Sequence, residues 1–278
     1  MNIRLIGLDL DGTVFDSHKR ITPRTRAAIA AACAQGVAVL PVTGRPRAGL
    51  PAEFLSIPGV KYAITSNGAV VCEAATGRVL SQSPMALEHA LWGLEMAEEL
   101  GALTDVYVDG RAYTKAATFH SLLQAAPENM KEYFRVTRVP VEDQRLWLMQ
   151  QKGPVEKLTM LFTSESQRQK AWTLFRDSGR FEATSSLQNN LELNGKGVDK
   201  GKALLALAAL LGFSQSQVMA CGDSTNDLAM LQAAGLSVAM GNACPQVLKA
   251  ARVRTATNDQ DGVALAIEQY VLNGKGAD

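Results

Sequence analysis

Short, continuously apolar segments alternate with helix-like segments in the first and last parts of the chain, and this alternation constrains the fold more than any other feature. The apolar segments cover residues 3–8, 37–42, 62–65, 217–221 and 236–240. Strands that are apolar throughout are buried on both faces, which favours a parallel sheet covered by helices on each side. The sequence therefore predicts an α/β fold with a Rossmann-like, doubly wound parallel sheet.

Helix signals separate these apolar segments. Thr22 and Pro23 are typical of an N-cap and a first helical position, and the alanine-rich segment that follows them ends at Gly36. Further helices are expected over residues 200–211 and 228–234. Both ends of the chain therefore contribute to one predicted core.

The middle of the chain has a different pattern. A helix is expected over residues 87–100, and Asp109-Gly110 between two alternating segments is a strong hairpin signal. A hairpin among mixed strands is typical of an α+β domain. We therefore predict a core formed by residues 1–83 and 190–278, with an inserted cap domain over residues 84–189.

The composition excludes several classes of function. Of the 278 residues, 28 are Lys or Arg and 27 are Asp or Glu, and this near-neutral balance argues against a general nucleic-acid binder. No apolar segment approaches the ~20 residues that a membrane-spanning helix needs, and we find no secretory signal. The four cysteines are scattered, so we expect buried thiols in a cytoplasmic protein.

Polar residues follow the predicted strands at the points where these strands end. Asp9 and Asp11 follow the first strand, Thr43 follows the second, and Asp223 follows a late strand. Lys200 stands at the start of a predicted helix. Ligands of open α/β sheets bind outside the carboxyl ends of the strands, so we expect these residues to converge on one site.

The first of these clusters indicates a cation. Residues two apart in an extended segment point to the same side, so Asp9 and Asp11 can address one substrate. Like charges this close repel each other, and we expect a metal ion beside them with Asp223 as a further ligand. Hard oxygen ligands favour Mg²⁺. An EF-hand is excluded because Gly12 is the fourth residue from Asp9, whereas that motif needs glycine at the sixth position.

Other motif templates fit poorly. A P-loop over residues 195–202 would need glycine in place of Lys196 and a hydroxyl residue after Lys202, and a dinucleotide loop would need glycine in place of Lys200. Asn226 stands where a nucleophile elbow has its last glycine, and the three histidines show no zinc spacing. Lys200 is the natural cation for a phosphoryl oxygen, with Lys196 and Lys202 as alternatives.

Four motifs together resemble the haloacid dehalogenase superfamily of phosphatases, and in particular its Cof-type subfamily of sugar-phosphate phosphatases. They are residues 9–13 (DLDGT), 42–46 (VTGRP), 198–201 (VDKG) and 222–230 (GDSTNDLAM). Residues 66–69 (SNGA) follow the second motif as they do in the subfamily. The likeness covers nearly the whole chain, and four motifs in this order are a specific signal.

The resemblance implies a role for each matched residue. Asp9 would be the nucleophile that becomes an aspartyl phosphate, and Asp11 would protonate the leaving alkoxide and then activate water. Mg²⁺ would be held by Asp9, by the backbone carbonyl of Asp11, and by Asp223.

The remaining matched residues would bind phosphate or support the site. The phosphoryl oxygens would be bound by the Leu10 backbone, Thr43, Gly44, Lys200 and Asn226. Supporting positions would be taken by Arg45, Asn67 and Asp227, with Asp227 positioning Lys200 or the metal.

The cap would close over the site, exclude water and select the leaving group of a small phosphomonoester. Tyr107, Arg111, Tyr113 and Lys157 lie on its predicted strands, and the sequence leaves open which of them face the substrate. Two other functions remain open: a phosphotransferase or mutase with the same motifs, and a non-catalytic phospho-ligand binder. The intact pair of aspartates, Asp9 and Asp11, favours the phosphatase.

Overall fold

The structure, a computed structural model, describes residues 2–273 of the chain. The chain divides into two units. Of the described residues, 2–44, 50–81 and 199–273 form the first unit, and 45–49 and 82–198 form the second. The first unit therefore combines both ends of the chain, and the second unit is inserted between them.

The first unit is built on a parallel sheet. Its strands, in spatial order, are β14 (Val253–Arg254), β13 (Leu236–Ala239), β12 (Val218–Gly222), β1 (Leu5–Leu8) and β2 (Ala38–Pro41). Every neighbouring pair is parallel. Strands β1, β12 and β13 are buried along their whole length, as continuously apolar sequences require. The predicted parallel sheet is confirmed.

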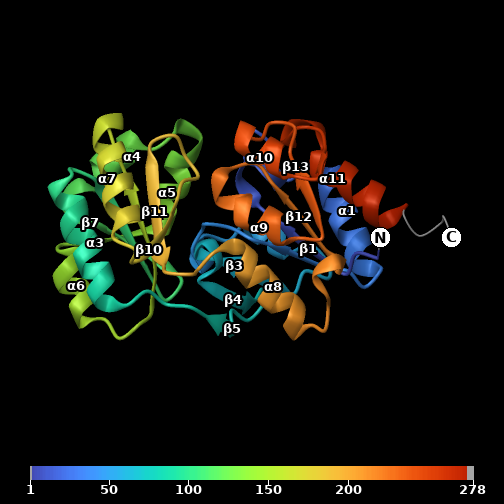
Figure 1. Cartoon of the computed structure of the whole chain (residues 1–278), viewed down its shortest axis with the longest axis horizontal. Helices are drawn as coiled ribbons and strands as arrows, with labels where there is room; N and C mark the ends of the chain where they lie inside the picture. The colour runs from blue at the N-terminus through green and yellow to red at the C-terminus, as the bar shows by residue number, and fades with distance from the viewer. Residues whose placement is uncertain (1, 274–278) are drawn as a thin grey trace. The chain divides into compact units, whose positions relative to one another are not determined.

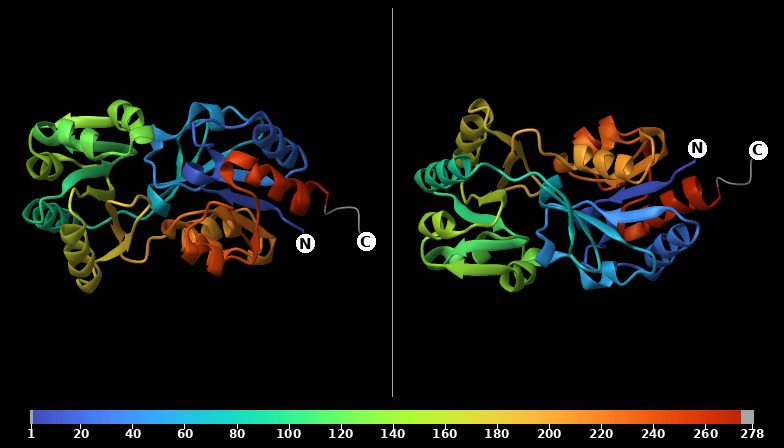
Figure 2. Two further views of the ribbon diagram at one scale, coloured as in Figure 1. Left: turned by 90° about the horizontal axis from the view of Figure 1, so that it is seen from above. Right: turned by 90° about the horizontal axis from the view of Figure 1, so that it is seen from below.

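Helices cover both faces of this sheet. Figure 1 shows β1 and β12 between α1 (Pro23–Ala34) and α11 (Gly262–Ile267) on one side, and α8 (Lys200–Leu210) and α9 (Leu228–Ala233) on the other. Figure 2 shows α11 packed beside α1, although they come from opposite ends of the chain. Two short helices complete this unit, α2 (Ala52–Leu55) and α10 (Pro245–Ala250).

The start of α1 follows the sequence signal. The Thr22 side chain accepts a hydrogen bond from the Thr25 backbone N–H at 3.1 Å, and Pro23 occupies the first helical position. Gly36 follows the helix with φ +80°, a conformation that favours glycine. The predicted cap and stop of this helix are confirmed.

Residues 62–65, which the apolar pattern assigned to the parallel sheet, belong to a separate one. Strand β3 (Tyr62–Thr65) pairs antiparallel with β4 (Val70–Glu73) in a three-stranded sheet that ends with β5 (Val79–Gln82). The turn after β3, in which Asn67 has φ +56°, reverses the chain direction and makes the antiparallel pairing with β4 possible. At the end of β2, the Thr43 N–H donates to the Ile64 carbonyl at 2.9 Å, and a parallel bridge joins Val42 to Ile64.

The second unit contains a mixed sheet. In spatial order its strands are β10 (Phe181–Thr184), β11 (Asn190–Gly195), β9 (Val155–Leu161), β6 (Leu103–Val108), β7 (Arg111–Lys115) and β8 (Arg138–Val141). Strands β6 and β7 form the predicted hairpin at Asp109-Gly110. Among the described strands of this sheet, β7 and β8 pair in parallel and the other neighbours pair antiparallel.

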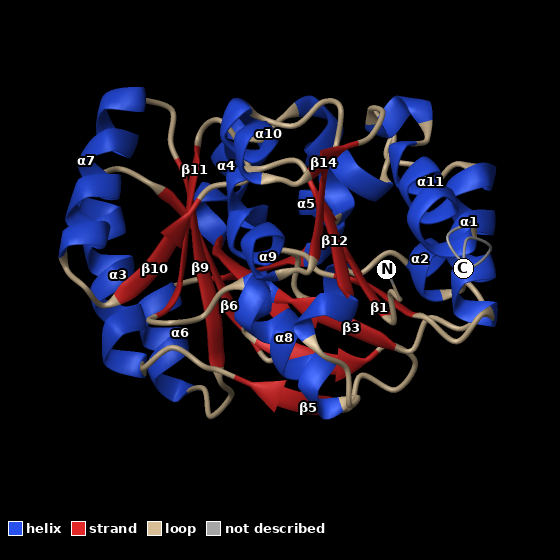
Figure 3. Cartoon of the chain, turned by 45° about the vertical axis from the view of Figure 1, so that its right-hand side comes forward, coloured by secondary structure: helices blue, strands red, loops and turns tan. Residues whose placement is uncertain are grey.

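Helices lie on both sides of this second sheet (Figure 3). One face packs against α3 (Leu87–Glu99) and α7 (Glu165–Asp177), which close over an apolar cluster. A smaller cluster on the other face involves α4 (Phe119–Ala125) and α5 (Lys131–Thr137). A further short helix, α6 (Gln144–Gln150), follows β8. An α+β insert is thus present.

The predicted boundaries of the insert need correction at one end and in one loop. We expected residues 190–198 in the core, but β11 pairs with β9 and β10, and its Leu191 and Leu193 pack in the second unit. Residues 45–49 also belong to the second unit, because the Ala48 N–H donates to the Gly110 carbonyl at 2.8 Å.

Within the described residues, no helix is both long and apolar enough to cross a membrane. All four cysteines are free thiols. Cys72 and Cys221 are buried as expected, whereas Cys33 and Cys244 are partly exposed.

Candidate active site

The turn after β1 carries the first acidic residues. Asp9 follows the last residue of β1 in an extended conformation, and its N–H donates to the Cys221 carbonyl of β12 at 3.1 Å. Gly12 has φ +89°, and a Cβ atom built there would lie 2.5 Å from Oδ2 of Asp223. A side chain at this position would therefore displace Asp223, which explains why the turn needs glycine.

Two aspartates follow β12. Asp223 accepts hydrogen bonds from the hydroxyl groups of Thr13 at 3.0 Å and Ser224 at 3.1 Å. Asp227 Oδ2 accepts hydrogen bonds from the backbone N–H groups of Asp223 at 2.9 Å and Ser224 at 3.0 Å. Because β12 lies beside β1, the two parallel strands bring Asp9 and Asp223 to the same edge of the sheet.

Lys200 joins these acidic residues. It begins α8, whose N-cap Asp199 accepts a hydrogen bond from the Lys202 N–H at 2.8 Å. Its ammonium group lies 2.7 Å from Oδ1 of Asp9 and 2.6 Å from Oδ1 of Asp227. Its side chain is fully buried, at 0% exposure.

The other two candidate lysines lie elsewhere. The Lys196 side chain is 64% exposed and pairs with Glu182, and that of Lys202 is 67% exposed and pairs with Asp199. Lys200 is therefore the lysine that meets the acidic residues.

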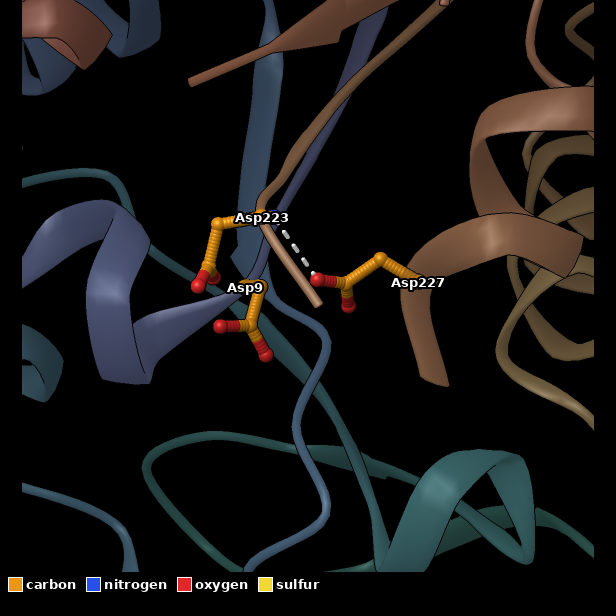
Figure 4. Close-up of side chains that lie close together, drawn as sticks. All are labelled: Asp9, Asp223 and Asp227. Atoms are coloured by element: carbon orange, nitrogen blue, oxygen red, sulfur yellow. Dashed lines mark hydrogen bonds between the residues drawn. The ribbon is translucent and has the colours of Figure 1, made fainter. Parts of the chain in front are cut away.

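Three carboxylates converge in this group. Figure 4 shows Asp9, Asp223 and Asp227 together, with the hydrogen bond from the Asp223 N–H to Asp227 dashed. One oxygen from each lies within 4.8 Å of the others, a grouping that could hold a metal ion. The carboxylate of Asp11 is not in this group, because it pairs instead with Lys19 at 2.7 Å.

The electrostatics of the group show an excess of negative charge, since one buried ammonium faces three carboxylates. Burial raises the pKa of Asp9 well above its ordinary value; Asp227 adds to this shift, and Lys200 opposes it. Burial and then Asp227 raise the pKa of Asp223 to about 7. Burial acts to lower the pKa of Lys200, but the charges of Asp227 and Asp9 outweigh it and raise this pKa.

Thr43, Asn67 and Asn226 are connected by hydrogen bonds. The Asn67 N–H donates to the Thr43 carbonyl at 3.0 Å, and the Asn226 side-chain amide contacts Oδ1 of Asn67 at 3.4 Å. The side-chain oxygen of Asn226 is buried and accepts no hydrogen bond. Hydrogen bonds therefore connect motif residues that follow β2, β3 and β12 within the first unit. Gly44 directly follows Thr43, and Leu10 directly follows Asp9.

Arg45 is placed differently from the other supporting residues. It belongs to the second unit, where its guanidinium lies 4.2 Å from the centre of the Tyr133 ring and donates to the Gly49 carbonyl. Its predicted supporting role remains a prediction.

The four strand residues of the second unit that are candidates to face the substrate have distinct environments. Tyr107 and Lys157 lie on one face of the sheet, with the Lys157 ammonium 4.6 Å from the Tyr107 ring centre and paired with Glu192. Arg111 is exposed, and Tyr113 packs on Trp147 with 3.9 Å between ring centres.

Sequence reasoning missed Lys19, Thr13 and Ser224. Thr13 and Ser224 stand beside the acidic motif residues, and this adjacency was the available signal. Lys19 stands in the basic run His18-Lys19-Arg20, whose composition does not separate a site residue from a solvated one.

Comparison with known proteins is consistent with this geometry. The model of the haloacid dehalogenase-like hydrolase family matches residues 6–267. The putative phosphatase YxeH of Bacillus subtilis is 32% identical, over 97% of this chain and 98% of its own length. The 5-amino-6-(5-phospho-D-ribitylamino)uracil phosphatase YcsE of the same species is 30% identical, over 98% of this chain and 97% of its own.

A solved structure agrees with the sequence matches. A haloacid dehalogenase-like hydrolase from B. subtilis superimposes with a TM-score of 0.86 and 26% identity, covering 97% of this chain and all of that one. The resemblance predicted from the four motifs is thereby confirmed. The chain belongs to the haloacid dehalogenase-like hydrolases.

Proposed function

We propose that the protein is a Mg²⁺-dependent phosphatase that hydrolyses small phosphomonoesters, with sugar phosphates as the leading substrate class, through an aspartyl phosphate on Asp9. The observation that carries the proposal is the placement of Asp9: a buried carboxylate at the end of β1, held by Lys200 and flanked by Asp223 and Asp227. The two relatives described above support it, because both are named as phosphatases, one of them of a phosphorylated ribityl compound.

The reaction has two steps in this proposal. A carboxylate oxygen of Asp9 attacks phosphorus while the bond to the leaving alkoxide breaks, and Asp11 donates a proton to that alkoxide. Water then attacks the aspartyl phosphate, and Asp11 takes up the proton that this water loses. Inorganic phosphate and the free alcohol leave, and both aspartates return to their starting states.

Lys200 favours the ionised form of Asp9 that the first step requires. A nucleophilic carboxylate must be ionised, whereas burial favours its protonated form. The ammonium of Lys200 at 2.7 Å favours the ionised form, and Asp227 fixes that ammonium from the other side at 2.6 Å. Asp227 is thus proposed to position Lys200 rather than to react.

The remaining motif residues are proposed to bind the phosphoryl oxygens. The donors would be the Leu10 backbone, Thr43, Gly44, Asn226 and Lys200. Asn226 and Asn67 are already connected to the Thr43 segment by hydrogen bonds, so Asn226 and Thr43 are held together before a substrate arrives.

The donor chemistry of the acidic group fits Mg²⁺. All three side chains offer hard carboxylate oxygens, and their negative charge exceeds that of the one lysine. Asp9, Asp223 and the Asp11 carbonyl would hold the ion, with Asp227 beside them. When bound, Mg²⁺ would supply positive charge that offsets the charge of the phosphoryl group.

We expect Mg²⁺ to raise the thermal stability more at about pH 8 than at about pH 5. Without metal, the pKa of Asp223 is raised from 3.8 to about 7, so the folded protein binds more protons than the unfolded chain between these values. The contribution of Asp223 to stability therefore falls as pH rises through this window. Bound Mg²⁺ removes that penalty at high pH, whereas protons compete with it at low pH.

Differential scanning fluorimetry with Mg²⁺ and with EDTA measures this difference. Asp223→Asn should lose most of the gain in Tm at the higher pH, while Asp109→Asn, an exposed control, should keep it. A gain that is equal at both pH values, or unchanged in Asp223→Asn, would argue against a metal at this group.

Phosphate release tests the proposed function directly. The purified chain is incubated with a panel of sugar phosphates and a generic aryl phosphate, with Mg²⁺ and with EDTA. We expect release that depends on Mg²⁺. Transfer of the phosphoryl group to an added sugar would instead indicate a phosphotransferase, and binding without release would indicate a phospho-ligand binder.

A further inference from the structure

The loop between the first motif and α1 presents Lys19 in an unusual conformation. Lys19 has φ +60°, a left-handed conformation that residues with a side chain rarely adopt. Backbone strain of this kind persists only where the surrounding structure imposes it, and it concentrates at functional sites.

Hydrogen bonds from two directions hold this loop. Within the loop, Oδ1 of Asp16 accepts from the N–H groups of His18 and Arg20 at 2.9 Å each, and the Lys19 N–H donates to the Asp16 carbonyl at 3.0 Å. Asp16 is almost fully buried, with 9% exposure. The loop conformation is therefore built around one buried carboxylate.

The second set of hydrogen bonds comes from the far end of the chain. The Ser17 N–H donates to Oδ1 of Asp259 at 2.7 Å, and the Asn258 side chain donates to the Phe15 carbonyl at 2.9 Å. These contacts fix the loop on both sides of Asp16, so the left-handed residue is held from outside as well as from within.

The result of this arrangement is an ion pair with Asp11. The Lys19 ammonium lies 2.7 Å from Oδ1 of Asp11, and the two side chains are 26% and 29% exposed. Ion pairs this exposed add little to the stability of a protein. A contribution to stability therefore does not explain why Lys19 is held in a strained conformation beside Asp11.

We propose that Lys19 is a positioning residue that holds the carboxylate of Asp11 in the orientation from which it exchanges protons with the leaving group and with water. This inference rests on the proposed function, in which Asp11 is the general acid and base. In this role Lys19 acts through its contact with Asp11.

The test uses two substrates that differ in their need for a general acid. The alkoxide of a sugar phosphate needs a proton as it leaves, whereas the phenolate of para-nitrophenyl phosphate does not. For Lys19→Met we expect kcat/KM with the sugar phosphate to fall about tenfold or more, and kcat/KM with the aryl phosphate to fall by less than about threefold. Asp11→Asn serves as the reference, with a larger loss of the same selectivity.

Two further variants separate positioning from structural effects. Lys19→Gly removes the side chain and suits the left-handed backbone, so it should show the same selective loss without a fall in Tm. Arg20→Met is the matched control, because it removes the neighbouring cation, which pairs with Asp16 and not with Asp11. We expect it to keep both activities.

The outcomes distinguish the inference from the proposed function. The proposed role of Lys19 would be overturned if Lys19→Met lost kcat/KM equally on both substrates or on neither. Phosphate release by the wild-type chain would still support the proposed phosphatase in that case. A wild-type chain that releases phosphate from neither ester would overturn the proposed function, and this inference with it.

Discussion

Replacing Asp9 with asparagine should abolish phosphate release while leaving the fold intact. The variant keeps the shape of the side chain and an oxygen that can accept from Lys200, but it lacks the carboxylate that is proposed to attack phosphorus. We expect kcat/KM to fall by about 10⁴-fold or more, as for the loss of other enzymatic nucleophiles. Steady-state assays of wild type and variant, with the same sugar phosphate and Mg²⁺, measure this loss.

The same substitution should not lower the stability of the metal-free protein at about pH 8. The raised pKa of Asp9 means that ionising it in the folded state is unfavourable, and this penalty is present above the folded pKa and absent at low pH. Asparagine removes the penalty, so we expect a Tm equal to or above that of wild type. This readout separates a missing nucleophile from a misfolded protein.

Asp109→Asn provides the matched control for Asp9→Asn. Asp109 is 76% exposed at the tip of the β6–β7 hairpin, and its φ of +47° is one that asparagine tolerates well. The control should retain activity.

Mass spectrometry of quenched wild-type enzyme should also detect a phosphorylated peptide that contains Asp9. Turnover of Asp9→Asn close to that of wild type would contradict its assignment as nucleophile.

The candidate site could be predicted from the sequence to the extent that it depends on strand ends. Asp9 follows β1 and Asp223 follows β12, and apolar strands flanked by polar residues are visible in the sequence. Because neighbouring parallel strands end at one edge, adjacency of β1 and β12 is enough to bring these two residues together. Lys200 could be placed at the start of a helix, with Lys196 and Lys202 left as alternatives.

Features that depend on distant contacts could not be predicted in the same way. Nothing local specifies a left-handed Lys19, because that conformation is imposed partly by Asn258 and Asp259 from the other end of the chain. Strand β11 has the alternating sequence NLELNG, and its pairing with β9 and β10 assigns it to the second unit. Local sequence patterns identify helices and strands well, but they do not determine which strands pair with one another.

The three candidate lysines also show the difference between what the sequence indicates and what the structure determines. Lys196, Lys200 and Lys202 stand within one short segment, and residue type alone does not separate them. The first turn of α8 does: Lys200 occupies its first position and points into the acidic group, whereas Lys202 lies two residues further and is 67% exposed. The difference in burial predicts a large difference in the effect of mutation.

Lys200→Met should therefore lose both stability and activity. The substitution leaves Asp9, Asp223 and Asp227 buried together without a cation, and removing one partner of a buried ion pair costs about 3–5 kcal/mol. It also removes the charge that favours the ionised form of Asp9 and that is proposed to bind the phosphoryl group, so we expect kcat/KM to fall by about 10²–10³-fold or more. Urea unfolding and steady-state assays measure the two losses.

The loss of stability in Lys200→Met should shrink as the pH falls and when Mg²⁺ is added. Without the ammonium, the pKa of Asp9 and the pKa of Asp223 rise further, so at about pH 5 these two groups take up protons and the repulsion within the acidic group falls. Added Mg²⁺ replaces the lost positive charge at about pH 8.

Lys196→Met, at an exposed pair with Glu182, should change stability by less than about 1 kcal/mol and keep its activity. If Lys196→Met instead proved the more damaging variant, the third motif would have to be reassigned to the glycine-rich segment before α8.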